Sequence, residues 1–136
     1  MDLEQLLASV PLTAGLEERV RRRLAGIGRV RTYPDGTMIV EEGATGTALY
    51  IVVSGRARIV RGGETIGEVA PGEFFGELAL IEDHPRSASA IADGDTECLL
   101  FPAWEFTALL AEHPELAVPI MRTLIARMHK REQHDS

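Results

Sequence analysis

Apolar residues recur at helical spacing near both ends of the chain, whereas the long central part follows a different pattern. Asp2 can cap a first short helix, and Pro11 and Thr13 then break and restart the helical pattern. The restarted segment carries an apolar residue at every fourth position and is followed by Gly28. These apolar positions are Leu16, Val20 and Leu24. The pattern therefore predicts N-terminal helices over residues 1–28.

Between residues 29 and 101 apolar and polar residues tend to alternate with a period of two, which is typical of strands. The strand-like segments are RVRTY, TMIVEE, ALYIVVSG, RARIVR, ETIGEV, SASAIA and ECLLFP. Turn-forming residues separate most of these segments, at Pro34–Gly36, Gly43–Gly46, Gly62–Gly63, Pro71–Gly72 and Asp93–Asp95. Short strands at this even spacing indicate a small antiparallel barrel or jelly roll.

Helical spacing returns at the C-terminal end of the chain. Pro102 and Pro114 can each start a helix, so we predict that residues 102–132 are helical. The last helix has an apolar stripe that can dock on the barrel, formed by Leu116, Ile120, Leu124 and Met128. Pro119 falls inside this pattern and predicts a kink or break near Val118, because proline removes a backbone hydrogen bond and clashes with the preceding turn.

The composition is that of an ordinary globular domain, with 136 residues of which 45% are hydrophobic and 26% are charged. The net charge of -7 makes the whole chain a poor nucleic-acid binder, since affinity for phosphate backbones depends on lysine and arginine. The chain opens with acidic residues rather than the basic region of a signal peptide, and no apolar run approaches the ~20 residues of a membrane span. We therefore expect a cytoplasmic location and no membrane segment.

Residues suited to catalysis or metal binding are sparse. A cupin-type metal site uses an H-x-H pair, but none of the four histidines forms one, and only His84 lies in the barrel region. Cys98 sits in an apolar strand and is expected to be a small core residue, and Trp104 is expected to pack against its own helix. No G-x-S-x-G or C-x-x-C motif is present. We predict no catalytic residue, no metal site and no cofactor.

The stretch GEFFGELALIEDHPRSASA, residues 72–90, carries the strongest candidate site. Gly76 permits a close approach of the backbone, and one helical turn after it would present free N–H groups to an anion. Arg86 adds a permanent cation with a fork suited to phosphate, and Ser87 adds a hydroxyl. Glu77 can accept from sugar hydroxyls, so the pair can bind a phosphate and a ribose together. On spacing alone, a Glu77–Arg86 salt bridge without any ligand is an equally good interpretation.

This stretch resembles the phosphate-binding cassette of cyclic nucleotide-binding domains, as found in the catabolite activator protein, protein kinase A regulatory subunits and cyclic nucleotide-gated channels. The matching residues are Phe75, Gly76, Glu77, Leu78, Ala79, Leu80, Pro85, Arg86 and Ala88. The resemblance extends from about residue 3 to 131 and implies a mainly β fold with flanking helices. It implies an eight-stranded antiparallel jelly-roll barrel between N-terminal helices and a hinged C-terminal helix. The whole chain, residues 1–136, is then one domain, with the barrel over 29–101 and the cassette over 74–90.

The resemblance also implies a role for each matched residue. Glu77 should accept from the ribose 2′-hydroxyl, and Arg86 should pair with the cyclic phosphate. Further phosphate contacts should come from the Ser87 side chain and from the backbone around Gly76, Leu78, Ala79 and Ala88. Ile59 and Val69 lie where family members line the base. Arg127, on the last helix, occupies the spacing at which channel-type members cover the base, although a solvated arginine is an alternative.

The resemblance implies a sensor that binds cyclic AMP, with cyclic GMP second, and moves its C-terminal helix. The chain stops at Ser136, so we expect no DNA-binding domain, and either a stand-alone module or a fragment of a larger regulator. Its effector protein is unknown, and a monomer or weak dimer is expected. Two alternatives remain: an enzyme on a cupin-like barrel, and an interaction domain that has lost its ligand.

Overall fold

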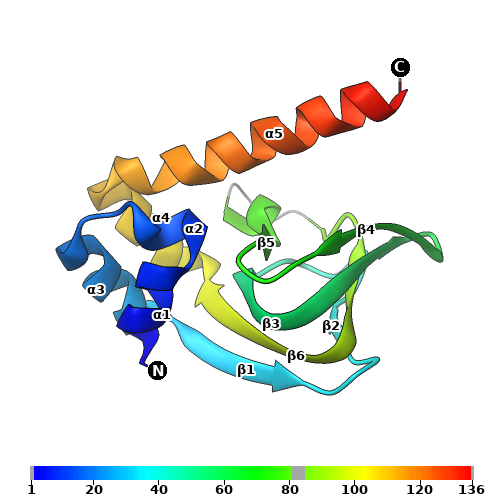
Figure 1. The fold of residues 1–136 in the computed structure, drawn as a ribbon, viewed down its shortest axis with the longest axis horizontal. Coiled ribbons are helices and arrows are strands. Elements are labelled where there is room, and N and C mark those ends of the chain that lie inside the picture. The colour runs from blue at the N-terminus through cyan, green and yellow to red at the C-terminus, as the bar shows by residue number, and fades with distance from the viewer. Residues whose placement is uncertain (1, 81–84, 136) are drawn as a thin grey trace.

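The computed structural model describes residues 2–80 and 85–135, which form an antiparallel sheet flanked by helices at both ends of the chain (Figure 1). The N-terminal helices are α1 (Leu3–Ser9), α2 (Pro11–Ala14) and α3 (Glu18–Ile27). The C-terminal helices are α4 (Ala103–Glu112), the 3₁₀ turn η2 (Pro114–Leu116) and α5 (Ala117–Asp135). Asp2 caps α1 as predicted, because its carboxylate accepts from the Gln5 amide at 2.8 Å.

The sheet is formed by six strands among the described residues, in the order β1-β6-β3-β4, with β2 added to β6 and β5 added to β3. Their bounds are β1 (Arg29–Tyr33), β2 (Met38–Val40), β3 (Ala48–Arg61), β4 (Glu64–Val69), β5 (Phe74–Phe75) and β6 (Ser89–Pro102). Every strand pairing is antiparallel. The mainly β fold with flanking helices is therefore confirmed.

The predicted count of eight strands is wrong for the described residues, and the sheet is not a closed barrel. The two long strands β3 and β6 each contain two of the segments predicted to be separate. Gly55 and Gly94 adopt φ of 78°, and the β3–β6 register shifts between Val52 and Arg56, so both strands bend here without ending. The predicted turn at Asp93–Asp95 thus lies inside β6.

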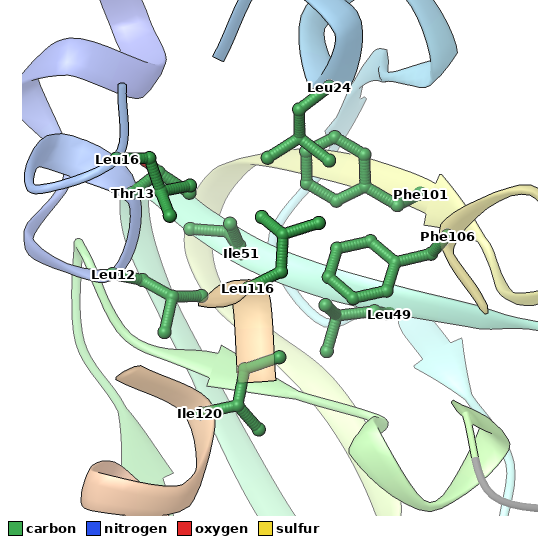
Figure 2. Close-up of a pocket in the computed structure, with 10 residues that line it drawn as sticks. All are labelled: Leu12, Thr13, Leu16, Leu24, Leu49, Ile51, Phe101, Phe106, Leu116 and Ile120. Carbon is green, nitrogen blue, oxygen red and sulfur yellow. The ribbon is translucent and has the colours of Figure 1, made fainter. Parts of the chain in front are cut away.

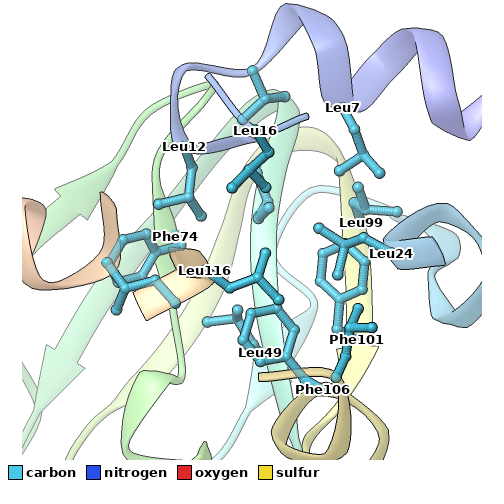
Figure 3. Packing of buried hydrophobic residues seen from close by; sticks show 14 of the residues in the cluster. Leu7, Leu12, Leu16, Leu24, Leu49, Phe74, Leu99, Phe101, Phe106 and Leu116 are labelled. Carbon is cyan, nitrogen blue, oxygen red and sulfur yellow. The ribbon is translucent and has the colours of Figure 1, made fainter. Parts of the chain in front are cut away.

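The curved sheet buries a different set of side chains on each face, because successive residues of a strand point to opposite sides. On β3, Leu49 and Ile51 face the helices and belong to the helix-side core shown in Figure 3. Tyr50 and Val52 face the other way. They join a second cluster, which we call the Tyr50 cluster and which consists of Ala48, Tyr50, Val52, Ala57, Val69, Phe75, Ala90 and Cys98. The burial of Cys98 confirms its predicted place in the core.

A small void lies inside the helix-side core, between the N-terminal helices, the sheet and the C-terminal helices (Figure 2). Its lining is almost entirely apolar, with Leu49, Phe101, Phe106 and Leu116 among the labelled side chains. Its volume of about 10 Å³ is no more than a single water molecule needs. This void is a packing defect that is too small for a nucleotide.

The last helix differs from its prediction in two ways, the origin of its break and the exposure of Met128. The break falls between Leu116 and Ala117, so Pro119 lies in the first turn of α5, where its missing N–H has no intrahelical partner to lose. Leu116 and Ile120 are buried as predicted, but Met128 is 61% exposed. Steps of four residues rotate by about 40° each, so the stripe drifts around the helix before it reaches Met128.

Trp104 corrects another prediction, because its side chain is 73% exposed. It lies in the first turn of α4, whereas Phe106 and Leu109 of the same helix are buried. Further exposed apolar side chains follow one face of α5, namely Val118, Met121, Ile125 and Met128.

Candidate functional site

The cassette leaves the sheet at β5 and turns sharply at Gly76, whose φ is 85°. A Cβ atom at Gly76 would come within 2.6 Å of Arg86 Nη1 and 2.8 Å of the Ala48 carbonyl oxygen. Only glycine fits here, both because of its backbone conformation and because no side chain has room. The following residues form the 3₁₀ turn η1 (Glu77–Leu80), which bears out one helical turn after Gly76. Ile81, the last residue of the apolar run that follows Glu77, lies outside the described residues.

Arg86 is half-buried and held against the sheet from several sides. Its Nη2 donates to the Ala48 carbonyl at 3.0 Å, and its Nη1 donates to the Gly76 carbonyl at 3.3 Å. The Arg86 amide donates to the Ala44 carbonyl at 2.7 Å, and its own carbonyl accepts from the Gly43 amide at 2.8 Å. The turn before β3 therefore fixes the backbone of Arg86, and β3 itself fixes the guanidinium.

The guanidinium also lies near an aromatic pair of the Tyr50 cluster. Its Cζ is 5.8 Å from the centroid of the Tyr50 ring, which stacks on Phe75 at 4.9 Å with an interplanar angle of 1°. Burial lowers the pKa of Arg86 below its ordinary value, and the nearby Tyr50 and Glu77 side chains oppose that shift. The protein thus holds a cation in a partly desolvated place, a cost that an anion could offset.

Glu77 does not form the salt bridge with Arg86 that spacing alone allowed. Its ion-pair partner among the described residues is Arg127 of α5, with 3.8 Å between Glu77 Oε1 and Arg127 Nη1. The Glu77 side chain is 22% exposed and that of Arg127 is 36% exposed. Arg127 also donates to the Phe74 carbonyl, and its Cζ lies 4.5 Å from the centroid of the Phe74 ring. The last helix is therefore tied to the first residues of the cassette.

The other residues assigned from the sequence surround this centre. Leu78 and Ala79 lie in η1, directly after Glu77. Ser87 is exposed, and its carbonyl accepts from Arg61 Nε at 3.0 Å. Ala88 is half-buried just before β6 begins. Val69 is buried in the Tyr50 cluster and Ile59 packs against it, so both predicted base-lining residues share the face that carries Tyr50.

Several residues of the site were missed in the sequence because they lie far from the cassette along the chain. A Cβ atom at Gly46 would come within 2.9 Å of Arg86 Cζ, so this glycine makes room for the guanidinium. Ala48 supplies a carbonyl acceptor, and Tyr50 supplies the ring beside it. The only signal for Gly46 was the GATG turn, which gave no indication of a partner 40 residues away.

The described residues contain no group of three or more histidine, cysteine or carboxylate side chains that could hold a metal ion. In the same part of the chain, no helix is long and apolar enough to cross a membrane.

Comparisons with known proteins agree with this geometry. A family model described as "Cyclic nucleotide-binding domain" matches residues 30–113, which include the cassette and most of the sheet. The cyclic AMP receptor protein of Thermus thermophilus is 39% identical over 126 residues, covering 88% of this chain and 58% of that protein. A cyclic nucleotide-gated potassium channel of Rhizobium etli is 33% identical over 123 residues, covering 90% of this chain and 34% of the channel.

A solved structure of the regulatory domain of Toxoplasma gondii PKA with cAMP has the same fold, with a TM-score of 0.79. Its sequence is 28% identical, and the match covers 93% of this chain and 49% of that chain. The chain thus spans only 58% and 34% of the two relatives above, which are longer proteins.

Proposed function

The chain belongs to the cyclic nucleotide-binding domain family, and we propose that it is a regulatory module that binds a cyclic mononucleotide, cyclic AMP in preference to cyclic GMP. The observation that carries this proposal is the state of Arg86, a half-buried guanidinium whose described partners are backbone carbonyls rather than a carboxylate. An anion with the size of a phosphate is the natural partner for such a fork.

In the proposed complex, Arg86 pairs with the cyclic phosphate, and the backbone around Gly76, Leu78, Ala79 and Ala88 holds its other oxygens, together with the Ser87 hydroxyl. Glu77 accepts from the ribose 2′-hydroxyl. Ile59 and Val69 line the base. The name of the cyclic AMP receptor protein and the cAMP complex of the Toxoplasma gondii regulatory domain support the choice of cyclic AMP, because these two proteins match 88% and 93% of this chain.

Isothermal titration of the purified chain with cyclic AMP and cyclic GMP tests the proposal, with linear 5′-AMP as the control. We expect a single site for cyclic AMP, weaker binding of cyclic GMP, and little binding of 5′-AMP. If neither cyclic nucleotide binds, the domain has lost its ligand and the proposal is wrong. A metal analysis of the same sample tests the cupin-type alternative, which requires a bound ion.

We further propose that the ligand moves α5, and that Arg127 is the contact through which it does so. The ribose would engage the carboxylate with which Arg127 is paired, so ligand and helix share Glu77. A ligand shifts the helix only if it favours one arrangement over the other, and couplings of this kind are ~1–3 kcal/mol. In the same proposal, Arg127 also covers the base of the bound nucleotide.

Hydrogen exchange with and without cyclic AMP tests this motion. We expect the ligand to slow exchange between Ile120 and Lys130 more than in α1–α3. Arg127→Ala should weaken binding about tenfold and reduce that protection, because the link between helix and cassette is lost. Equal exchange of α5 in the two states would show that this helix does not carry the signal.

The remaining parts of the proposal concern context. We propose a single domain over residues 1–136 without catalytic activity, located in the cytoplasm and acting on an effector protein of unknown identity. The exposed apolar side chains of α5 form a narrow stripe, which suits a monomer or a weak dimer better than an obligate one.

A further inference from the structure

Arg61 is a second guanidinium beside the proposed pocket, at the last position of β3. Ala57 belongs to the Tyr50 cluster and Ile59 packs against it, so the alternation of the strand places Arg61 on the same face. Across the sheet, Val60 of β3 is paired with Ser89 of β6. This register brings the end of β3 next to the end of the cassette.

The contacts of Arg61 leave most of its donors available. Its Nε donates to the Ser87 carbonyl at 3.0 Å, which holds the guanidinium beside the end of the cassette. Within the described part of the chain, neither terminal nitrogen of Arg61 has a hydrogen-bond or ion-pair partner. The neighbouring carboxylate of Glu42 accepts instead from the Gly62 amide at 3.0 Å.

Arg58 shows that this arrangement is particular to Arg61. It lies on the same strand, three residues before Arg61, so the alternation of the strand places its exposed side chain on the opposite, outer face of the sheet. The two arginines therefore share strand and charge, and differ in the face they occupy.

We propose that Arg61 is a base-specificity residue of this pocket, and that it contacts the edge of the purine that carries hydrogen-bond acceptors. The proposal rests on the proposed function, because it requires a purine base against Ile59. Arg61 lies two residues after Ile59 on the same face of β3. Guanine presents two acceptors, O6 and N7, on one edge, which suits an arginine fork. Adenine presents N7 beside an N6 amino donor, which meets a donor-only guanidinium poorly. Arg61 thus admits cyclic GMP to a pocket that otherwise favours cyclic AMP.

Titrations of the full chain and of Arg61→Met with both nucleotides test this role. Methionine keeps an apolar stem of similar length and removes the donors. We expect Arg61→Met to weaken cyclic GMP binding about tenfold, and cyclic AMP binding by less than threefold. Arg58→Met is the matched control and should change neither affinity by more than twofold.

Two analogues identify the edge. Cyclic IMP has O6 and N7 but lacks the guanine amino group, so it should lose as much affinity as cyclic GMP in Arg61→Met. Cyclic 7-deaza-GMP lacks N7, so it should bind the parent more weakly than cyclic GMP and respond less to the substitution.

Equal losses for both cyclic nucleotides would overturn the proposal, since Arg61 would then only hold the Ser87 backbone. A loss for cyclic GMP that is absent for cyclic IMP would assign the amino group instead, and would overturn it as well. Absence of any nucleotide binding by the parent chain is a different result, which refutes the proposed function and this inference with it.

Discussion

Replacing Arg86 by methionine separates a ligand-binding role from a structural one. In the folded chain the substitution removes two hydrogen bonds, to the carbonyls of Ala48 and Gly76. It also removes the cost of holding a cation in a partly buried place, which is seen in the lowered pKa of Arg86. Because a hydrogen bond to a charged group contributes ~1.5–3 kcal/mol, and the relieved desolvation offsets it, we expect unfolding free energy to change by about 1 kcal/mol or less.

The effect on binding should be much larger. Without its guanidinium partner, the bound phosphate is a partly buried, unpaired anion. Removing one partner of a buried ion pair typically costs ~3–5 kcal/mol, and here this cost appears in the binding free energy. This corresponds to a loss of roughly a hundredfold to several thousandfold in affinity for cyclic AMP. A large loss of affinity with little change in unfolding free energy therefore indicates that Arg86 binds the ligand and does not stabilise the fold.

Isothermal titration measures the affinity, and urea unfolding without ligand measures the stability. Arg56→Met is the control, because Arg56 lies on β3 in an exposed pair with Glu68 at 3.0 Å, where little energy is expected. An affinity within threefold of the parent would remove Arg86 from the site. A stability loss of about 3 kcal/mol or more would show that the guanidinium braces the fold, as a structural salt bridge would.

Three further predictions test other parts of the structure. Glu77→Ala should weaken cyclic AMP binding by about ten- to a hundredfold and should no longer distinguish it from the 2′-deoxy analogue; a parent that binds both analogues equally would exclude the ribose role. Gly46→Ala should displace the Arg86 guanidinium, 2.9 Å from the new Cβ atom, and should weaken binding about tenfold with little change in unfolding free energy, since Gly46 does not adopt a positive φ; unchanged titrations would show that the fork adjusts freely. Burial raises the pKa of the Cys98 thiol from 9.0 to about 12, so the unfolded chain ionises first and stability falls as pH rises between these values. Between pH 8 and pH 10 the parent should lose about 1.4 kcal/mol more than Cys98→Ala in urea unfolding, and parallel losses in the two proteins would mean that the thiol is accessible.

The cassette was predictable because its chemistry is local in the sequence. Gly76, Glu77 and Arg86 lie within a single short loop, so residue type and spacing already suggested an anion site and a sugar site. The contacts that orient Arg86 were not predictable, because Gly46 lies just before β3 and Ala48 is its first residue, about 40 residues earlier in the chain. Their positions depend on strand register, which the periodicity of a single segment does not specify.

The errors in the fold have a similar origin. Glycine and aspartate at positions 93–95 have the composition of a turn, yet Gly94 bends β6 without ending it because β3 bends beside it at Gly55. In α5, a stripe drawn at every fourth residue predicted that Met128 would face the barrel. Seven residues make about two helical turns, so the residue of α5 that returns to the face of the buried Ile120 is Arg127. The same geometry that exposes Met128 thus brings Arg127 to the cassette.

The two arginines near the cassette have different partners, and this difference suggests why the site suits a cyclic nucleotide. Arg127 is paired with a carboxylate, whereas the guanidinium of Arg86 is held only by carbonyls and an aromatic ring among the described residues. Free phosphate could offset the charge of Arg86 but would leave Glu77 as it is. A nucleoside without phosphate could reach Glu77 but would leave Arg86 without an anion. Only a ligand that carries a hydroxyl and an anion in fixed positions engages both groups, and a ribose closed into a ring with its phosphate holds them in that way before it binds.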